Sequence, residues 1–365
     1  MTAFLVILVI LLFGISVWQM NRIFQLARQK PIGHADIASK KDNNTQGYLM
    51  IAFLIFIYVL AALTFYFWYG TLLPKSGSEH GAKIDNLMLV TMIILFIAGI
   101  LTQALLHYFA FAYRGNIKRR ATHYADNDRL EFIWTIIPVI TLAGLIIYGL
   151  FTWTDVMNVN QDDDPLVIEL YAYQFGWKAR YGGADNTLGD ANVRLIEGVN
   201  ALGVDPSDPN ALDDKVVSEV HLPVGRKVLF KIRSQDVLHS AYMPHFRAQM
   251  NCVPGMITQF AFTPTVTTDE MRQTDWVIDK VNNINAIRLK ESEKLMAAGD
   301  EALEPYEFDY LLLCNKICGV SHYNMQMKII VETEEEYNAC CLIASRRACM
   351  RPASALPVTS PSSPA

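Results

Sequence analysis

The sequence lacks two features that would narrow its function at once. It contains no CxxCH motif, so the chain itself carries no covalently attached c-type haem. The part after residue 154 has no excess of positive charge, because it holds 19 Lys and Arg against 29 Asp and Glu. Nucleic acid is therefore not an expected partner, and such an acidic surface either aids solubility or steers a basic partner.

Apolar residues make up 52% of the chain, more than one soluble domain usually carries, and they are concentrated before residue 154. Four runs approach or exceed the roughly 20 residues that cross about 30 Å of hydrocarbon. We expect four transmembrane helices, at Thr2–Met20, Tyr48–Leu73, Leu87–Tyr113 and Phe132–Trp153. The first run has no basic residue before it and no small-x-small cleavage site after it, which favours a helix over the alternative of a signal peptide.

The loops between these runs differ in charge. Residues 21–47 and 114–130 each carry five Lys and Arg, whereas the loop around Pro74 has only Lys75 and Lys83. Because Lys and Arg are retained on the cytoplasmic side, both basic loops are expected inside. The N-terminus and the chain after Trp153 are then expected outside.

From Leu166 onward the pattern changes to short alternating runs, such as LVIELYAY and KVLFKIRS, separated by Pro and Gly turns. This pattern predicts an antiparallel β-sandwich. Residues 183–215 are rich in Asp, Asn and Gly and are predicted to be a surface loop, whereas residues 284–304 have a helical composition. The tail 339–365 has low complexity and is expected to be disordered.

Residues 314–325 read CNKICGVSHYNM and gather two thiols, an imidazole and a thioether. A disulfide is the default expectation for cysteines in an oxidising compartment. The spacing of Cys314 and Cys318 instead suits two thiolates of one loop that converge on one point, with His322 and Met325 following on that loop. These soft donors select copper over hard cations, and a structural zinc site rarely uses Met.

A mononuclear electron-transfer copper site uses one Cys, two His and a weak axial Met, which leaves a second Cys over. Two thiolates bridging two coppers use both cysteines if another His arrives from a different strand. The stretch SQDVLHSAYMP offers His239. The weaker candidates are His221, inside a predicted strand, and His245, interpreted as a surface residue or a neighbour of the ligands. Cys252 is interpreted as a small buried apolar residue.

Together these segments resemble subunit II of the haem-copper cytochrome c oxidases, whose outer cupredoxin-type domain holds the binuclear CuA centre. The resemblance rests on DVLHS, the later VPG, CxxxCGxxHxxM, and LEFIWTIIP at residues 130–138. It implies membrane α-helices followed by an all-β, cupredoxin-like sandwich. We expect two extra transmembrane helices with a basic cytoplasmic loop in residues 1–73, a transmembrane hairpin in 74–154, and the CuA domain with two insertions in 155–338.

The resemblance also implies the ligands and the partners. The bridging thiolates would be Cys314 and Cys318, the imidazole ligands His239 and His322, the thioether Met325, and a further ligand the backbone carbonyl of Lys316. Electrons would come from a c-type cytochrome, or from the c-type domain of a neighbouring complex. They would pass to catalytic subunit I, which holds the haems, reduces oxygen and pumps protons. Other oxidase subunits and the lipid of a bacterial inner membrane complete the expected surroundings.

Three residues match other functional positions of the family. Glu131 stands where the family has a carboxylate at the mouth of a proton path, although a helix-start carboxylate that favours the dipole is an equal alternative. The stretch YQFGWKARY resembles the aromatic segment through which electrons enter. Trp177 matches that segment, whereas Phe175 replaces a usual Trp and is either an electron-entry residue as well or, the interpretation that this replacement favours, a core residue.

Two positions depart from the family. Lys316 stands where the family generally has a Glu that reaches a magnesium or manganese ion, and Asn251 stands where it tends to have Asp. An ammonium group offers donors only, so we expect the magnesium site to be absent. The Lys316 ammonium then either replaces the cation or points to solvent.

Two alternative functions share parts of this pattern. The CuA subunit of a nitric oxide reductase differs only in its partner subunit. A copper-free quinol-oxidase subunit II should lack the Cys pair.

Overall fold

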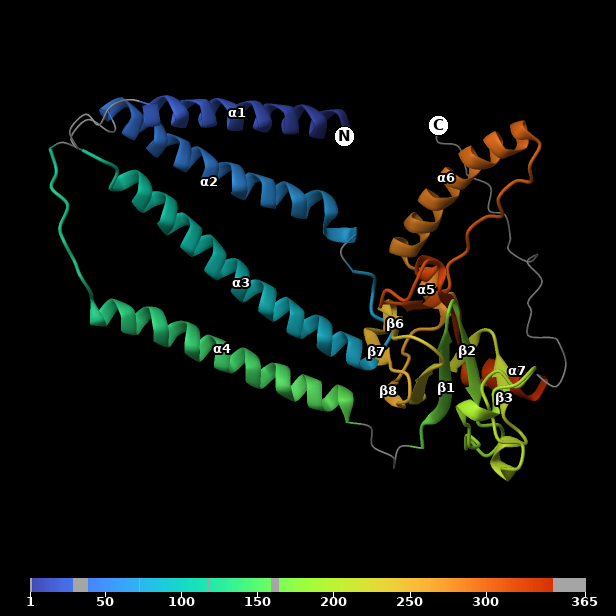
Figure 1. Cartoon of the computed structure of the whole chain (residues 1–365). Coiled ribbons are helices and arrows are strands. Elements are labelled where there is room, and N and C mark those ends of the chain that lie inside the picture. The colour runs from blue at the N-terminus through green and yellow to red at the C-terminus, as the bar shows by residue number, and fades with distance from the viewer. Residues whose placement is uncertain (1, 29–38, 72, 117, 159–163, 344–365) are drawn as a thin grey trace, which may run out of the picture. The chain divides into compact units, whose positions relative to one another are not determined.

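The computed structural model describes residues 2–28, 39–71, 73–116, 118–158 and 164–343. The chain divides into two compact units, one made of Met1–Phe67 and Ile94–Glu131, the other of Trp68–Ile93 and Phe132–Ala365. Figure 1 shows the whole chain and labels its α-helices and several of its strands.

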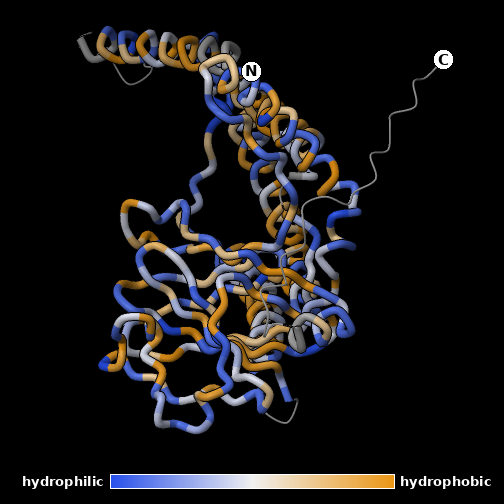
Figure 2. Tube along the Cα trace, turned by 90° about the vertical axis from the view of Figure 1, so that its right-hand side faces the viewer, coloured by the Kyte–Doolittle hydropathy of each residue, from blue (hydrophilic) through white to orange (hydrophobic). Residues whose placement is uncertain are grey.

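Four long helices precede the β-strands. Each is long and apolar enough to cross a membrane, and orange, the colour of hydrophobic residues, recurs along them in Figure 2. Most of their large apolar side chains are exposed. So much exposed apolar surface is unfavourable in water, which identifies these helices as membrane-spanning. They are α1 (Thr2–Arg28), α2 (Lys40–Trp68), α3 (Glu79–Ala112) and α4 (Asp128–Met157).

Within the first unit, α2 packs against the second half of α3. The Tyr58 hydroxyl donates to the backbone carbonyl of Ile100 at 2.6 Å, and the rings of Phe65 and Phe96 meet edge-on at 5.1 Å. These contacts lie between helices whose backbone bonds are satisfied internally, as the hydrocarbon interior requires.

The second unit contains two five-stranded sheets. One has the order β3-β2-β1-β5-β8 and the other β4-β10-β9-β6-β7. The strands are β1 (Leu166–Tyr173), β2 (Gly176–Tyr181), β3 (Lys215–Val217), β4 (Val220–Pro223), β5 (Val228–Ser234), β6 (His239–Met243), β7 (Ala248–Cys252), β8 (Thr258–Phe262), β9 (Tyr310–Cys314) and β10 (Gln326–Glu332). Alternating apolar side chains of both sheets, including Ile168, Phe230 and Leu312, form one buried core.

The sandwich is mixed, so the expectation of an antiparallel sandwich was wrong in two places. β1 runs parallel to β5, and β4 runs parallel to β10. Strand alternation predicts burial but carries no information on direction, because parallel and antiparallel strands share the two-residue period of side chains.

Two segments extend the sandwich. Residues between β2 and β3 include the short 3-10 helices η3 (Val193–Leu195) and η4 (Pro209–Ala211). Between β8 and β9 lie α5 (Thr268–Arg272) and α6 (Asp275–Ala298), which ends at Gly299 in the left-handed conformation with φ +91°. Helix α6 therefore starts nine residues before the predicted bound of 284. It is preceded by α5, which Thr267 caps with a capping box.

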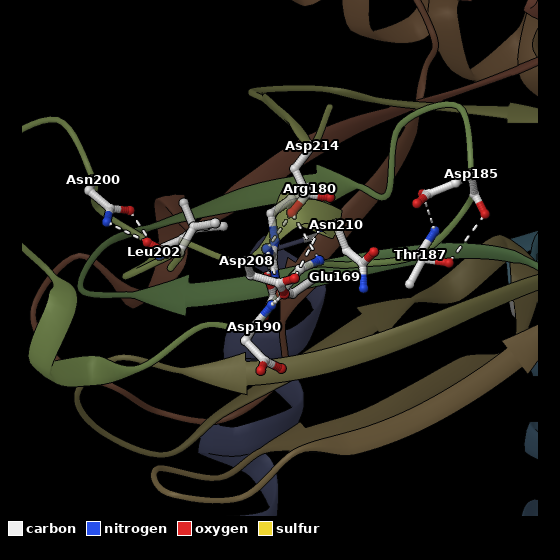
Figure 3. Close-up of polar contacts among 12 residues, drawn as sticks. Glu169, Arg180, Asp185, Thr187, Asp190, Asn200, Leu202, Asp208, Asn210 and Asp214 are labelled. Carbon is white, nitrogen blue, oxygen red and sulfur yellow. Dashed lines mark hydrogen bonds and ion pairs between the residues drawn. The ribbon is translucent and has the colours of Figure 1, made fainter. Parts of the chain in front are cut away.

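A charged group fastens the first of these segments to the sheet. Arg180 on β2 pairs with Glu169 on β1 and with Asp214 of the insertion, each at 2.6 Å (Figure 3). Arg233 on β5 also pairs with Glu169 and donates to the Leu202 carbonyl at 3.1 Å. We call these four charged residues the Arg180 cluster; three of the four side chains are at most 4% exposed.

The chain beyond β10 corrects one boundary. Helix α7 (Glu334–Ile343) includes residues 339–343, which had been assigned to a disordered tail. Three glutamates in its first turn favour the helix through the dipole. Residues 344–365 of the expected tail lie outside the described residues.

Candidate metal centre

The five side chains of the predicted copper site come together at one end of the second sheet. His239 begins β6 and Cys314 ends the neighbouring β9, since Ala241 pairs with Cys314 in register. The loop after Cys314 supplies Cys318 and, through η6 (His322–Asn324), His322. Met325 follows immediately before β10. We call His239, Cys314, Cys318, His322 and Met325 the donor cluster.

Each thiol contacts one imidazole nitrogen and one further donor. Cys314 Sγ lies 3.8 Å from His239 Nδ1 and 3.2 Å from the carbonyl oxygen of Lys316. Cys318 Sγ lies 3.5 Å from His322 Nδ1 and 3.8 Å from Met325 Sδ. The two sulfurs are 3.9 Å apart and both cysteines are free thiols.

These separations fit donors that share metal ions. Donors bound at about 2.0 to 2.3 Å in tetrahedral geometry lie roughly 3.3 to 3.8 Å apart. The ligand atoms of His239, Cys314 and Cys318 lie within 4.8 Å of one another. His239 and Met325 are almost fully buried and Cys318 is 6% exposed, whereas Cys314 and His322 are partly exposed, so water reaches only part of the donor cluster.

Burial also affects the acidity of the Cys318 thiol. Burial, reinforced by the neighbouring Cys314, raises the pKa of Cys318 to about 11. The thiolate form that a soft metal binds is therefore unfavourable at neutral pH unless a cation compensates the charge.

Two residues that sequence reasoning missed hold the donors in place. The Asp236 carboxylate contacts His239 Nε2 at 2.8 Å, which leaves Nδ1 directed at Cys314. Gln174 bridges the two sides of the cluster, because its backbone N–H donates to Asp236 at 2.7 Å and its side-chain amide donates to the Cys318 carbonyl at 2.5 Å. Partial burial raises the pKa of Asp236, but the bonds to His239, Gln174 and Val237 outweigh it and leave the pKa below its usual range. The DVLH spacing is the sequence signal that could have identified Asp236.

The two aromatic residues predicted for electron transfer lie beside the cluster. The Trp177 ring is 6.4 Å from the His239 ring, and its Nε1 donates to the Met325 carbonyl at 3.5 Å. Phe175 packs against Gly319 of the copper-motif loop, where an added Cβ would lie 2.7 Å from the Phe175 ring. Trp177 belongs to the buried core and Phe175 packs on that core as a partly buried residue.

The side chains of the other predicted residues are not among the five donors. Glu131 is exposed in the first turn of α4. Lys316 has an exposed side chain, and Asn251 is exposed on β7 opposite Ser240. Cys252 is fully buried, as expected. The interpretation of His245 as a surface residue was wrong: it is 7% exposed and packs against the rings of Phe308 and Tyr310.

Two family models match this chain. The transmembrane domain of cytochrome c oxidase subunit II matches residues 66–151, and the periplasmic domain of that subunit matches residues 166–271. The alternative cytochrome c oxidase subunit 2 of Bradyrhizobium diazoefficiens is 28% identical over 80% of this chain and 90% of its own length. Cytochrome c oxidase subunit 2 of Thermostichus vulcanus is 23% identical over 74% of this chain and 79% of its own length.

Among solved structures, the periplasmic domain of subunit II of cytochrome oxidase from Bradyrhizobium japonicum is similar at 17% identity and a TM-score of 0.29, over 49% of this chain and 93% of that one. The two family models together match more than half of the chain, in the order expected for membrane helices followed by a cupredoxin-like domain. The chain belongs to the cytochrome c oxidase subunit II family.

Proposed function

We propose that this chain is the CuA-bearing subunit that receives electrons for a haem-copper terminal oxidase. It accepts them from a c-type cytochrome and relays them to catalytic subunit I, which reduces oxygen and pumps protons. The observation that carries the proposal is the symmetry of the donor cluster: each thiol contacts one imidazole and one further donor, Lys316 O at Cys314 and Met325 at Cys318.

The donor set fits a pair of soft metal ions better than one. A single tetrahedral ion has room for four ligands, whereas five side chains and one carbonyl converge here. A copper pair bridged by two thiolates, when bound, shares one electron over both nuclei, so its geometry changes little on reduction.

The residues around the donors keep that geometry fixed. Asp236 orients the His239 ring, Gln174 ties the Cys318 carbonyl, and Trp177 covers the buried side of His239. Because these supports come from three different strands or loops, the donors change position little when charge is added.

The proposed topology follows from the charge of the loops. Both basic loops lie in the cytoplasm of a bacterium, and the N-terminus and the cupredoxin-like domain lie on the outer side of its inner membrane. The acidic outer domain then faces the c-type donor, whose basic surface it attracts.

Glu131 is proposed to serve proton entry on the cytoplasmic side. Its exposed carboxylate in the first turn of α4 supports this role only by position. We expect Glu131→Gln to slow steady-state turnover of the complex while copper content and donor oxidation stay unchanged. Turnover equal to that of the wild type would assign Glu131 to helix capping alone.

Lys316 is proposed to replace the magnesium or manganese ion of the family. The exposed ammonium is free to pair with acidic groups of subunit I that would otherwise bind the metal. Growth of the source with excess manganese, followed by metal analysis of the purified complex, tests this. Stoichiometric, tightly held manganese next to the copper pair would refute the replacement.

The proposed function is tested on the purified intact complex by metal and haem analysis, paramagnetic resonance, and assays with oxygen, nitric oxide and quinol. We expect two coppers per subunit II, an electron spectrum shared over two nuclei, and oxygen consumption driven by a reduced c-type cytochrome. One copper with a mononuclear spectrum would contradict the binuclear site. Nitric oxide reduction without oxygen reduction would assign the chain to a nitric oxide reductase, and quinol oxidation without copper would remove the electron relay.

A further inference from the structure

Strand β6 carries a copper-motif histidine at its start and leads directly into a second fixed point at its end. There the 3-10 turn η5 (Pro244–Phe246) is gripped by the segment that precedes α3. The Gly77 N–H donates to the His245 carbonyl at 2.8 Å, and the Ser78 hydroxyl donates to the Phe246 carbonyl at 2.7 Å. The η5 backbone is therefore held by the chain that enters the membrane.

Arg247, the residue after η5, makes the strongest of these contacts. Its guanidinium binds both carboxylate oxygens of Asp85 on α3, at 2.8 and 2.9 Å, and donates to the Pro74 carbonyl at 2.7 Å. The side chain is only 8% exposed, and no other ion pair to Asp85 occurs among the described residues. A shielded two-pronged pair fixes orientation as well as distance.

The segment before α3 is shaped to receive this arginine. An added Cβ at Gly81 would lie 2.0 Å from Ser76 Oγ and 3.1 Å from Arg247 Cγ, so a larger residue would force these side chains to move. On its other side the segment joins the end of β8: Glu79 N–H donates to the Thr263 carbonyl at 3.1 Å, and Thr265 N–H donates to the Gly77 carbonyl at 2.8 Å. Ser78 thus forms an isolated antiparallel β-bridge with Pro264, directly before α3 begins at Glu79.

The insertion α6 fastens the same turn from a third direction. The His245 ring packs 6.3 Å from the Trp276 ring, and Trp276 Nε1 donates to the carbonyl of Gly70 at 2.7 Å. Gly70 belongs to η1 (Tyr69–Thr71), the turn directly after α2. Trp276 therefore links the chain after α2 to η5, and Gly77 and Ser78 link the chain before α3 to the same turn.

We propose that Arg247 is a positioning residue for the electron relay. By pairing with Asp85 it fixes the far end of β6 on α3, and β6 transmits that fixed position over five residues, roughly 17 Å, to His239 at the copper site. This inference rests on the proposed function, because it concerns the step that passes electrons from the copper pair to subunit I. The rate of that electron transfer falls steeply with distance. It therefore depends on how firmly the outer domain is held.

The test uses the purified oxidase complex with Arg247→Met, Asp85→Asn, the double variant, and Arg247→Lys. The matched control is Lys83→Met. Lys83 lies on α3, two residues from Asp85, and the substitution removes its exposed ion pair with Asp155 of α4. Three quantities are measured: the copper spectrum, the rate of donor oxidation, and the rate of electron transfer from copper to haem after rapid photoreduction.

We expect Arg247→Met and Asp85→Asn each to slow copper-to-haem transfer on the order of tenfold, with the copper spectrum and donor oxidation unchanged. The double variant should be no slower than either single variant, because the pair acts as one unit. Arg247→Lys keeps the charge without the two-pronged geometry and should be intermediate. Lys83→Met should match the wild type.

Wild-type transfer rates in both single variants would overturn the proposal. Should Arg247→Met fail to assemble, Arg247→Lys decides by the same rate. Hydrogen exchange of the wild-type complex gives an independent answer. The amides of Gly77, Glu79 and Thr265 should exchange as slowly as those of β8, and exchange as fast as in exposed loops would contradict the attachment of the segment before α3 to the outer domain. A wild-type complex without copper would refute the proposed function, and this exchange test of the attachment would remain valid.

Discussion

The outer domain contains two polar clusters that solve the problem of burial in opposite ways. In the Arg180 cluster, two carboxylates of the first sheet and its insertion meet two guanidinium groups, so every charge finds its partner within the chain. In the donor cluster, sulfur and nitrogen atoms lie 3.5 to 3.9 Å from one another, at separations that suit ligands of a shared metal. The first cluster is therefore satisfied by charges of the chain itself, whereas the second offers a set of soft donors that a metal would complete.

The sharpest way to separate the clusters is to remove one thiol. Cys318→Ser should abolish the shared-electron spectrum completely, because a hydroxyl does not replace a bridging thiolate for soft copper. The control is Cys252→Ser, a buried cysteine whose backbone pairs with His239 but whose side chain is outside the donor cluster. Paramagnetic resonance and copper analysis of the complex distinguish the two; a retained binuclear spectrum in Cys318→Ser would rule out thiolate bridging.

The converse experiment breaks the self-sufficient cluster. Arg180→Met strands Asp214 and half of the Glu169 charge in a buried site, which typically costs about 3 to 5 kcal/mol. The temperature at which the outer domain unfolds should fall while the copper spectrum below that temperature is unchanged. Lys83→Met, which breaks a surface pair, should cost at most about 1 kcal/mol. A copper spectrum altered by Arg180→Met would mean that the clusters are coupled.

A third buried polar group belongs to neither class, because neither ring nitrogen of His245 has a hydrogen-bond partner among the described residues. Burial, with smaller effects of Lys280 and Arg247, lowers its pKa from 6.5 to about 4. Below pH 6.5 the unfolded chain binds a proton that the folded protein refuses until about pH 4. The free energy of unfolding should therefore fall by up to about 3 kcal/mol as the pH is lowered from 6.5 to about 4.

This dependence is checked by thermal unfolding of the complex across that pH range. His245→Phe should flatten the loss of stability, whereas His123→Gln, at an exposed histidine of the loop before α4, should leave it unchanged. An equal pH dependence in His245→Phe and the wild type would show that His245 is charged in the folded protein.

The smallest expected effect lies inside the donor cluster itself. The Met325 sulfur lies 3.8 Å from Cys318 Sγ, and a thioether is a weak axial ligand. Met325→Leu should keep both coppers and shift the reduction potential on the order of tens of millivolts. Potentiometric titration of the copper absorbance measures this shift. Loss of one copper would instead make the thioether an essential ligand.

Local features of the molecule could be predicted from the sequence, and long-range ones only in part. Membrane helices and the spacing of Cys314, Cys318, His322 and Met325 are properties of short segments, so hydropathy and donor chemistry suffice. His239 lies 75 residues from Cys314. It could still be predicted as a ligand, because a soft binuclear site requires a second imidazole.

The remaining contacts carry no local signal. Arg247 and Asp85 are 162 residues apart, and an isolated arginine in a sequence gives no indication of its partner. His245 was misjudged for the same reason, since the aromatic residues that bury it come from α6 and β9 and from the chain between them. The parallel pairing of β1 with β5 likewise depends on chain path rather than on side-chain alternation.

The position of α6 has a practical consequence. The match to the family domain ends at residue 271, four residues before this helix of 24 residues, and the copper motif resumes only at Cys314. Helix α6 and the exposed chain that follows it connect β8 of one sheet to β9 of the other. Extra length in this connection therefore changes the strand register of neither sheet. Doubling such a loop adds only about 0.6 kcal/mol of closure entropy. The exposed chain between Glu301 and Ala302 is thus a suitable insertion site for an affinity tag or a fluorescent label. Such a tag would allow the whole oxidase to be isolated or tracked without a change to the donor cluster.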